Sequence, residues 1–338
     1  MEEEKGRVCV TGGTGFIGSW LIMRLLDHGY SVRTTVRSDP EQKRDLSFLT
    51  NLPRASERLQ IFNADLNNPE SFDAAIAGCT GVIHVAAPID IHGKEPEEVI
   101  IQRAVSGTIG ILKSCLKSGT VKRVVYTSSA STVHFSGKDV DMLDETFWSD
   151  VDYIRKLDIW GKSYKLSKTL TERTALEFAE EHGLDLVTII PSFVTGPFIC
   201  PQLAGSVRGT LAMVMGNREE YSMLLNISMV HIDDVARAHI FLLEYPDVKG
   251  RSEGHPEWSL ILLCAWRSTP EFSTLRFCAV LHFTPLSWVG LLLLCIQQGI
   301  SMVQLVGSLL VLESFIRVDF LSPLLFGLVA DALSCGIS

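Results

Sequence analysis

A glycine-rich stretch at residues 8–18, VCVTGGTGFIG, constrains the fold of this chain more than any other part of the sequence. It begins as a short apolar strand, passes through a glycine turn and continues as a helix that ends at Gly29. In this pattern Gly12 permits the tight turn, Gly15 lets a pyrophosphate approach the backbone, and Gly18 lets the helix pack closely. A glycine triplet alone is a weak signal, but the strand before it and the helix after it distinguish it from an ordinary glycine-rich turn. The helix N-terminus offers N–H groups and a positive dipole end to phosphates. The predicted dinucleotide contacts here are Gly12, Thr14, Gly15, Phe16, Ile17 and Gly18.

The residue that follows the second predicted strand, residues 31–36, indicates which dinucleotide is bound. An acidic residue at that place would bond the ribose 2′-hydroxyl of NAD, whereas an arginine suits the 2′-phosphate of NADP. Arg37 stands there, and Lys43 and Arg44 follow closely. A solvated basic loop is the alternative, mainly for Lys43 and Arg44. We therefore expect NADPH rather than NADH.

Two further apolar segments, residues 59–62 and 81–87, are predicted as strands of the same sheet. Asp65 follows the first of them, where a carboxylate could bond an adenine amino group or cap the next helix. The second ends in small residues, including Ala86, that leave room for a cofactor. His84 lies inside this apolar strand, so we expect a packed, hydrogen-bonded histidine rather than a catalyst.

A helix over residues 96–118 is predicted to lead into a strand over residues 121–129 that ends in hydroxyl side chains. Ligands of open parallel sheets bind beyond the carboxyl ends of the strands, which places Ser128 and Ser129 for chemistry. Alone, a Thr-Ser-Ser strand end is more often a turn.

Tyr164 and Lys168 lie four residues apart in a predicted helix that begins near residue 163, so they share one helix face. A tyrosine has an ordinary pKa of about 10 and needs help to act as a general acid or base near neutrality. A neighbouring ammonium lowers that pKa by stabilising the phenolate. A surface Tyr–Lys pair is the common alternative, but the dinucleotide loop and the serines upstream favour a catalytic pair.

Residues 184–190 are predicted as a further strand, and residues 191–197 as a turn of the kind that holds a nicotinamide carboxamide by its backbone. His231, Asp233 and Asp234 follow at the start of another predicted helix. Capping of that helix by Asp233 or Asp234 is a simpler account of this cluster than catalysis.

The composition excludes several other functions. The net charge is −9, the sequence pI is near 5.5 and no basic stripe is present, which argues against nucleic acid as a partner. The eight cysteines show no C-x-x-C pair, so neither a zinc site nor a disulfide framework is predicted. The N-terminus lacks the features of a signal peptide, and we expect a cytoplasmic protein with reduced thiols.

The composition changes after Arg251. Residues 252–338 contain no lysine, and helices there would be hydrophobic on every face. Residues 277–296 are uncharged and long enough to span a membrane, although His282 and Pro285 weaken that interpretation.

Taken together, these motifs resemble the extended short-chain dehydrogenase/reductase superfamily, in the plant branch of dihydroflavonol, anthocyanidin and vestitone reductases. The resemblance covers about residues 6–251, and the segments 43–53 and 135–145 are most similar to the vestitone reductases. It rests on residues 8–20, Arg37, residues 63–66, residues 127–130, Tyr164, Lys168 and residues 230–234.

The resemblance implies an NADPH-dependent enzyme that reduces a flavonoid-like ketone to the alcohol. Tyr164 would protonate the carbonyl oxygen, Lys168 would lower the pKa of Tyr164 and bind the nicotinamide ribose, and Ser129 would hydrogen-bond the carbonyl, with Ser128 as the alternative. His134 replaces the Asn with which dihydroflavonol reductases contact substrate, which favours a related flavonoid or another ketone. The further implied cofactor contacts are Arg37, Arg44, Asp65, Leu66, Ala86, Tyr164, Lys168, Pro191 and Val194.

The expected fold is an α/β, Rossmann-type doubly wound parallel sheet over residues 6–251, followed by a small, atypical C-terminal substrate region. In the family, the segment after Arg251 closes the substrate pocket. Residues 252–338 share none of that pattern. We interpret them as an aberrant hydrophobic tail produced by a retained intron or a change of frame, with a membrane-anchored variant as the alternative.

Two other functions compete with ketone reduction. One is a sugar-nucleotide epimerase or hydroxysteroid dehydrogenase, since these enzymes share the catalytic residues that correspond to Ser129, Tyr164 and Lys168. The other is a dinucleotide-binding protein with little or no turnover, because the C-terminus is altered. We expect a monomer that acts on a small molecule, binds no metal and has no nucleic-acid or membrane partner.

Overall fold

The computed structural model describes residues 5–37, 45–89, 95–139, 143–212, 229–245 and 250–251. In chain order, the elements are β1 (Arg7–Thr11), α1 (Phe16–Asp27), β2 (Ser31–Val36), α2 (Ser47–Thr50), α3 (Ala55–Arg58), β3 (Leu59–Asn63), η1 (Pro69–Phe72), α4 (Asp73–Ile76), β4 (Gly81–His84), α5 (Glu97–Ser118), β5 (Arg123–Thr127), η2 (Ala130–Thr132), α6 (Val151–Lys156), α7 (Lys162–His182), β6 (Leu186–Ile189), β7 (Phe193–Thr195), α8 (Gly205–Thr210), β8 (Met229–His231), α9 (Ile232–Glu244) and β9 (Gly250–Arg251).

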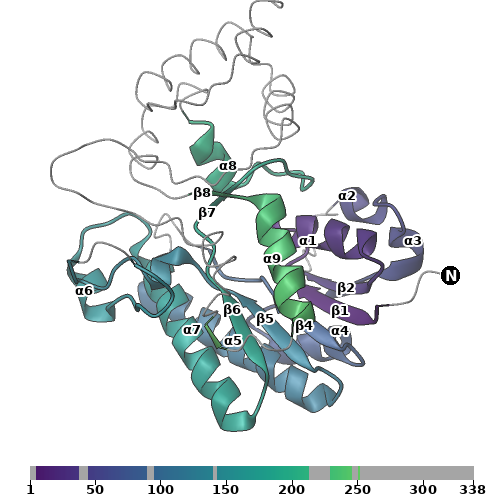
Figure 1. Cartoon of the computed structure of the whole chain (residues 1–338), viewed down its shortest axis with the longest axis horizontal. Helices are drawn as coiled ribbons and strands as arrows, with labels where there is room; N and C mark the ends of the chain where they lie inside the picture. Colours follow the sequence, from purple (N-terminus) through teal and green to yellow (C-terminus); the bar gives the residue numbers. More distant parts are fainter. Residues whose placement is uncertain are drawn as a thin grey trace, which may run out of the picture.

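Seven of the described strands form one parallel sheet in the order β3-β2-β1-β4-β5-β6-β9. The chain begins at β1 in the interior of the sheet, moves outward to β3, and then returns to β4 on the other side of β1 (Figure 1). This reversal opens a crevice at the carboxyl ends of β1 and β4, where ligands of doubly wound sheets bind. The predicted doubly wound parallel fold is therefore confirmed.

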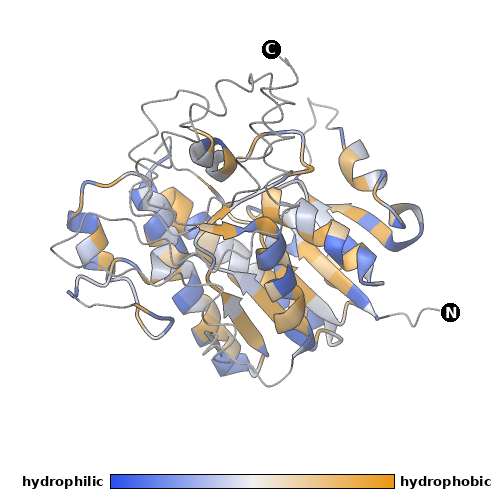
Figure 2. Ribbon diagram, turned by 45° about the horizontal axis from the view of Figure 1, so that its top comes forward, coloured by the Kyte–Doolittle hydropathy of each residue, from blue (hydrophilic) through white to orange (hydrophobic). Residues whose placement is uncertain are grey.

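Helices cover both faces of the sheet, and side chains that alternate along each strand supply both cores. In β1, Val8 and Val10 pack with residues of α1 and α9, whereas Cys9 packs on the other face with residues of α4, α5 and α7. Strands buried on both faces are almost uniformly apolar. The orange strands in the interior of Figure 2 show this pattern.

α5 is the one described helix that is long and apolar enough to cross a membrane by length and composition. In the fold it packs against α7 and α4, and its residues Ile111, Leu112 and Cys115 are buried in the core. Its apolar face is therefore explained by packing within the domain. The predicted candidate span at residues 277–296, like the whole of residues 252–338, lies outside the described residues.

Two details differ from the sequence-based expectations. β5 ends at Thr127, so Ser128 and Ser129 lie just after the strand rather than within it. The turn predicted after residue 190 contains a short strand, β7, which pairs in parallel with β8 to form a second sheet. That pairing depends on the approach of segments far apart in the chain, which no local pattern reveals.

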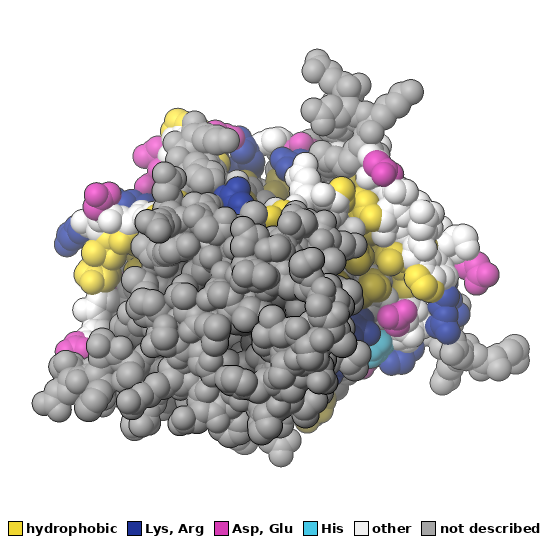
Figure 3. Space-filling model, turned by 90° about the horizontal axis from the view of Figure 1, so that it is seen from above, with side chains coloured by type: hydrophobic (Ala, Val, Ile, Leu, Met, Phe, Trp, Pro, Cys, Tyr) yellow, Lys and Arg dark blue, Asp and Glu magenta, His cyan; other side chains and the backbone are white. Residues whose placement is uncertain are grey.

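On the face shown in Figure 3, described side chains of both charges are interspersed rather than gathered into one basic patch.

Candidate active site and cofactor cleft

The loop between β1 and α1 has the backbone that its glycines predict. Gly12 adopts φ +75°, which favours glycine, and its carbonyl accepts a hydrogen bond from the N–H of Gly15 at 3.0 Å. A Cβ on Gly18 would lie 2.3 Å from the oxygen of Gly12, so α1 approaches the loop more closely than any other residue would permit. Gly12 permits the turn and Gly18 the close packing, as predicted.

Gly13 carries a constraint that the spacing of Gly12, Gly15 and Gly18 does not predict. A Cβ at this position would lie 2.1 Å from Oγ1 of Thr34 in β2, and the Gly13 N–H donates to the carbonyl of Thr35 at 3.0 Å. The loop is thereby fastened to β2 as well as to α1. The two adjacent glycines, Gly12 and Gly13, are the sequence feature that could have indicated this close contact with β2.

The N-terminus of α1 is suited to receive an anion. Gly15 occupies the N-cap position, is exposed and supplies no side-chain cap, so the first N–H groups of the helix are not covered by a side chain of that residue. Ala86 closes the other side of the loop, because a Cβ on Gly12 would lie 3.1 Å from its Cα. Such a bare glycine cradle fits a pyrophosphate group.

The other predicted cofactor residues lie at the same edge of the sheet. Arg37 is exposed directly after β2. Asp65 follows β3, and its carboxylate accepts from the N–H of Asn67 at 2.7 Å, which makes a turn rather than the helix cap considered from the sequence. The N-cap of η1 is instead Asn68. Leu66 packs against Gly107 of α5. Arg44 lies outside the described residues.

Pro191 and Val194 follow β6 in the chain and contact two neighbouring segments. The carbonyl of Pro191 accepts from the N–H of Ala130 at 2.9 Å, which ties this segment to the serines after β5. Val194 in β7 is buried in a cluster that includes Phe16 and Ile17 of α1. Val194 therefore lies beside the start of α1, whereas Pro191 lies beside the segment that follows β5.

Ser129 and Tyr164 come together across the sheet edge. Oγ of Ser129 accepts from the backbone N–H of Ser131 at 3.2 Å and from the hydroxyl of Ser131 at 3.0 Å. Burial raises the pKa of Tyr164, while a hydrogen bond with Ser129 opposes the rise. The net direction is opposite to the expected lowering by Lys168. A raised pKa keeps the phenol protonated at neutral pH.

Lys168 lies one helical turn beyond Tyr164 and points down to the sheet. Its side chain is buried, its Nζ donates to the carbonyl of Thr127 at 2.8 Å, and it lies 5.2 Å from the centre of the Tyr126 ring. Burial lowers the pKa of Lys168 to about 8, and Glu172 acts in the opposite direction. The ammonium is therefore held at the strand end close to the pair formed by Ser129 and Tyr164.

The hydroxyl of Ser128 is hydrogen-bonded to Glu172 and not to Tyr164. The serine is buried, and its hydroxyl donates to Oε2 of Glu172 at 2.5 Å. Of the two serines that the sequence left open, Ser129 is thus the one turned towards Tyr164. The carboxylate of Glu172 was not singled out from the sequence, although its position four residues after Lys168 on the same helix was a usable signal.

Comparison with known proteins agrees with this geometry. The model of the NAD dependent epimerase/dehydratase family matches residues 8–253. The chain belongs to this family. Vestitone reductase from Medicago sativa is 57% identical over 256 residues, which cover 76% of this chain and 78% of the relative. Its crystal structure superposes with a TM-score of 0.65 over 74% of this chain and 77% of the other, at 53% identity.

Two more distant relatives match a similar part of the chain. Dihydroflavonol 4-reductase from Zea mays is 49% identical over 248 residues, which are 73% of this chain and 69% of the relative. The structure of Gre2 from Candida albicans in complex with NADPH matches with a TM-score of 0.59 and 26% identity, over 72% of this chain and 76% of that one. The resemblance predicted from the motifs is confirmed.

The buried histidine of this epimerase/dehydratase-family protein is structural, as predicted. Oγ1 of Thr11 accepts from the N–H groups of Val85 and Ala86, so its own hydroxyl donates to Nδ1 of His84 at 2.9 Å. Nε2 of His84 then donates to Thr108 at 3.0 Å. Burial, together with the charge of Lys168, lowers the pKa of His84 to about 3. The ring stays neutral and fixes β1 to β4 below the cleft.

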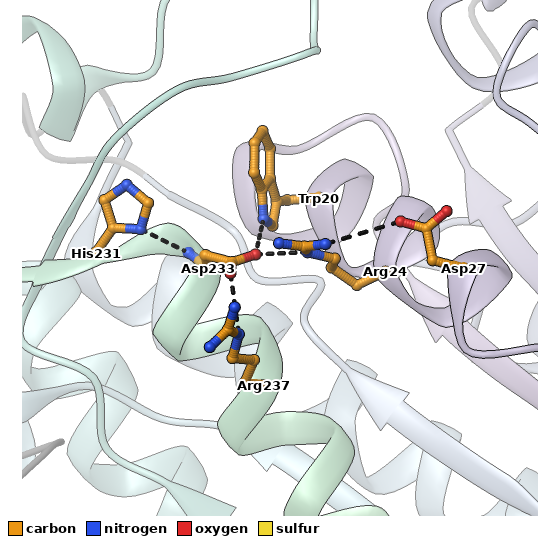
Figure 4. A network of polar contacts seen from close by, with 6 residues as sticks. All are labelled: Trp20, Arg24, Asp27, His231, Asp233 and Arg237. Atoms are coloured by element: carbon orange, nitrogen blue, oxygen red, sulfur yellow. Dashed lines mark hydrogen bonds and ion pairs between the residues drawn. The ribbon is translucent and has the colours of Figure 1, made fainter. Parts of the chain in front are cut away.

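The cluster at the start of α9 corrects a second prediction. The helix is capped by His231, whose Nδ1 accepts from the N–H of Asp233 at 3.2 Å, and not by Asp233 or Asp234. Asp233 instead joins α9 to α1: its Oδ1 accepts from Nε1 of Trp20 at 3.0 Å and from Nε of Arg24 at 2.5 Å (Figure 4). Oδ2 pairs with Arg237 at 3.0 Å. This network holds the cofactor helix against the rest of the fold.

We expect Asp233→Asn to lower the free energy of unfolding by about 1–3 kcal/mol at neutral pH, because it leaves Arg24 without its buried partner. Burial raises the pKa of Asp233, but the hydrogen bonds from Arg24 and Trp20 lower it by more, and the net shift is downward. The stabilisation is therefore complete above the unfolded value of about 3.9 and is lost as pH falls through the folded pKa. Urea unfolding from about pH 2 to pH 7 would measure this.

Asp27→Asn is the matched control, since Asp27 contacts the same Arg24 at 3.8 Å but its side chain is 45% exposed, against 12% for Asp233. We expect a change below about 0.5 kcal/mol. Equal losses for the two variants, or a loss for Asp233→Asn that stays constant down to about pH 2, would contradict the role of the network.

Proposed function

We propose that this protein is an NADPH-dependent reductase that converts a ketone of a flavonoid- or isoflavonoid-like substrate to the alcohol, with Tyr164 as the proton donor. The relatives named vestitone reductase and dihydroflavonol 4-reductase support the substrate class. The observation that carries the proposal is the arrangement of three residues at the edge of the sheet that holds the glycine loop. A side-chain hydrogen bond from Ser129 counteracts the rise that burial causes in the pKa of Tyr164, and Lys168, one helical turn further on, donates to the carbonyl of Thr127.

The described residues fit NADPH at this edge. The backbone of residues 12–18 would hold the pyrophosphate, Arg37 the 2′-phosphate, and Asp65 and Leu66 the adenosine end. Ala86, Pro191, Val194 and Lys168 would border the nicotinamide end. When bound, NADPH supplies the hydride for the reduction. The complex of Gre2 with NADPH supports this choice of cofactor.

The side chains of this protein donate the proton to the carbonyl oxygen. Oγ of Ser129 already accepts two hydrogen bonds from Ser131, so its own hydroxyl is available to donate. A carbonyl oxygen at the meeting point of Ser129 and Tyr164 would accept from both hydroxyls. Tyr164 transfers its proton as the oxygen becomes negative, and the Lys168 ammonium stabilises the phenolate that remains. General acid catalysis of this kind accelerates a reaction by about 10²–10⁴-fold.

His134 is proposed to contact the substrate. It follows η2, only five residues after Ser129, and its side chain is exposed. An imidazole there offers a hydrogen bond in place of an amide. We also propose that the protein acts in the cytoplasm as a monomer, on a small molecule and without nucleic acid or a membrane. The acidic net charge supports the absence of a nucleic-acid partner.

The test is consumption of NADPH by the full chain with a panel of flavanones, dihydroflavonols, isoflavanones and non-flavonoid ketones. Turnover confined to the flavonoid-like ketones is the expected result. Tight NADPH binding without turnover on any ketone would select the alternative of a dinucleotide-binding protein, and interconversion of sugar nucleotides would select an epimerase.

We expect Arg37→Ser to weaken NADPH binding by about 1.5–3 kcal/mol, or roughly 10- to 100-fold, because a charged hydrogen-bond donor to the 2′-phosphate is removed. NADH lacks that phosphate, so its affinity should not change. Titration of intrinsic fluorescence with each cofactor measures both constants. Lys122→Ser is the control, since Lys122 is an exposed cation at the start of β5, at the opposite edge of the sheet. An equal loss of affinity for NADH in the Arg37 variant would contradict the assignment.

A further inference from the structure

Glu172 is a fully buried carboxylate that the proposed mechanism does not use. It lies in α7 one helical turn after Lys168, and its exposed fraction is 0%. A carboxylate removed from water is strongly disfavoured unless hydrogen bonds and an opposite charge compensate it. The fold must therefore provide both at this position, and the surroundings of Glu172 show how.

Two hydroxyl groups donate to the two oxygens of this carboxylate. Ser128 donates to Oε2 at 2.5 Å, and Thr188 donates to Oε1 at 2.8 Å. Ser128 directly precedes Ser129, while Thr188 lies in β6 opposite Tyr126 of β5. Glu172 thus ties α7 to the ends of both strands, and the helix that it anchors is the one that carries Tyr164. The bond from Ser128 has the short length typical of a hydroxyl that donates to an ionised oxygen.

The charge of Glu172 acts on a lysine whose other neighbours are uncharged near neutral pH. The titratable groups that face Lys168 are Tyr164 and Glu172 from its own helix, Tyr126 from β5, and His84 from β4. α5 contributes Thr108, which is hydrogen-bonded to His84 and carries no charge. Burial raises the pKa of Tyr126 and lowers that of His84 to about 3, so neither carries charge at pH 7.

We propose that Glu172 is the positioning residue of this site: its buried carboxylate keeps Lys168 in the ammonium form and anchors α7 so that Tyr164 meets Ser129. The importance of this charge for turnover rests on the proposed function, but its effect on Lys168 does not. Without Glu172, burial alone would act on Lys168. Half of the ammonium would then be lost well inside the physiological pH range.

The direct test is the titration of Lys168 in the full chain labelled with 15N at lysine Nζ. The signal is assigned by its disappearance in Lys168→Met. In Glu172→Gln, an isosteric and neutral change, we expect the pKa of Lys168 to fall by about 1–2 pH units, because a nearby opposite charge shifts a pKa by about that amount. An unchanged titration midpoint would overturn the proposal.

Two variants separate the charge from the packing. Ser128→Ala removes one hydrogen bond but keeps the carboxylate, so the pKa of Lys168 should not fall; a fall as large as in Glu172→Gln would overturn the proposal. Thr171→Val is the matched control on the same helix. Thr171 is buried, and among the described residues its hydroxyl has no hydrogen-bond partner. The substitution should therefore change neither the pKa of Lys168 nor the stability of the fold.

Kinetics distinguish this inference from the proposed function. If the wild type reduces ketones, the loss of activity at high pH should begin about 1–2 pH units lower in Glu172→Gln, because the ammonium is lost earlier. A uniform loss at all pH values would overturn the role of the charge in turnover. If the wild type reduces no ketone but the titration shifts as expected, the proposed function fails and the assignment of Glu172 stands.

Discussion

Replacement of Tyr164 by Phe is expected to lower kcat for ketone reduction by about 10²–10⁴-fold, because the variant keeps the ring but lacks the proton donor. NADPH affinity and the melting temperature should remain close to those of the wild type. The hydroxyl of Tyr164 meets Ser129 at the cleft, and the rest of α7 is held by contacts that the substitution leaves intact. Steady-state kinetics together with an NADPH titration would measure the two effects separately.

Tyr153→Phe is the matched control. Tyr153 lies in α6 and is 41% exposed, and its ring packs under Gly137 rather than in the cleft. The same chemical change there should leave kcat within about twofold, as is usual for surface substitutions. A loss of kcat below tenfold in Tyr164→Phe would mean that the proton comes from another group. Loss of NADPH binding in parallel would indicate a structural role instead.

The second large effect is expected from Gly18→Ala. The added methyl group would lie 2.3 Å from the oxygen of Gly12, and this neighbour is backbone that cannot rotate away. Separation of α1 from the loop should cost about 1–3 kcal/mol of stability, the usual range for overpacking. It should also weaken NADPH binding at least about tenfold, because the phosphate-binding N–H groups move with the helix. Thermal unfolding and fluorescence titration would record both losses.

Two other glycines allow this prediction to be separated from a general effect of alanine. A Cβ on Gly15 would meet only the Gly12 oxygen at 3.3 Å, and Gly15 is exposed, so Gly15→Ala should affect the cofactor more than the fold. A Cβ added to Gly205 in α8 would meet no described atom within 4 Å, and we expect Gly205→Ala to change neither quantity. Equal stability of the Gly18 and Gly205 variants would show that the loop tolerates the methyl group.

The sequence predicted the parts of this fold that follow from local chemistry. The glycine spacing in residues 8–18 implies a strand, a turn and a helix in that order, and apolar runs between turn residues imply buried parallel strands. Tyr164 and Lys168 share a helix face by their spacing alone. The net pKa of Tyr164 differs from the expectation: burial raises it, and the extent of burial depends on packing that the spacing of Tyr164 and Lys168 does not contain.

The parts that the sequence did not predict depend on contacts between distant segments. Asp233 looked like a helix cap because acidic residues are common there, yet its partners Trp20 and Arg24 lie more than two hundred positions earlier. Glu172 looked like one of many acidic residues on a helix, because Ser128 and Thr188 approach it only in the folded sheet. The roles of Ser129, Tyr164 and Lys168 themselves remain predictions until the kinetic tests are made.

The position of α9 has a consequence for the order in which a newly made chain can fold. α9 packs on α1 and against β4, β5 and β6, and Arg123 of β5 donates to the carbonyls of Leu242 and Tyr245. Proteins are synthesised from the N-terminus, so β1 to β6 and α1 leave the ribosome well before α9, which completes the cover of the face on which α1 packs. Until residues 229–245 emerge, that apolar face is open to chaperones or to other nascent chains. A translational pause before this segment should therefore favour aggregation, whereas a pause after it should not.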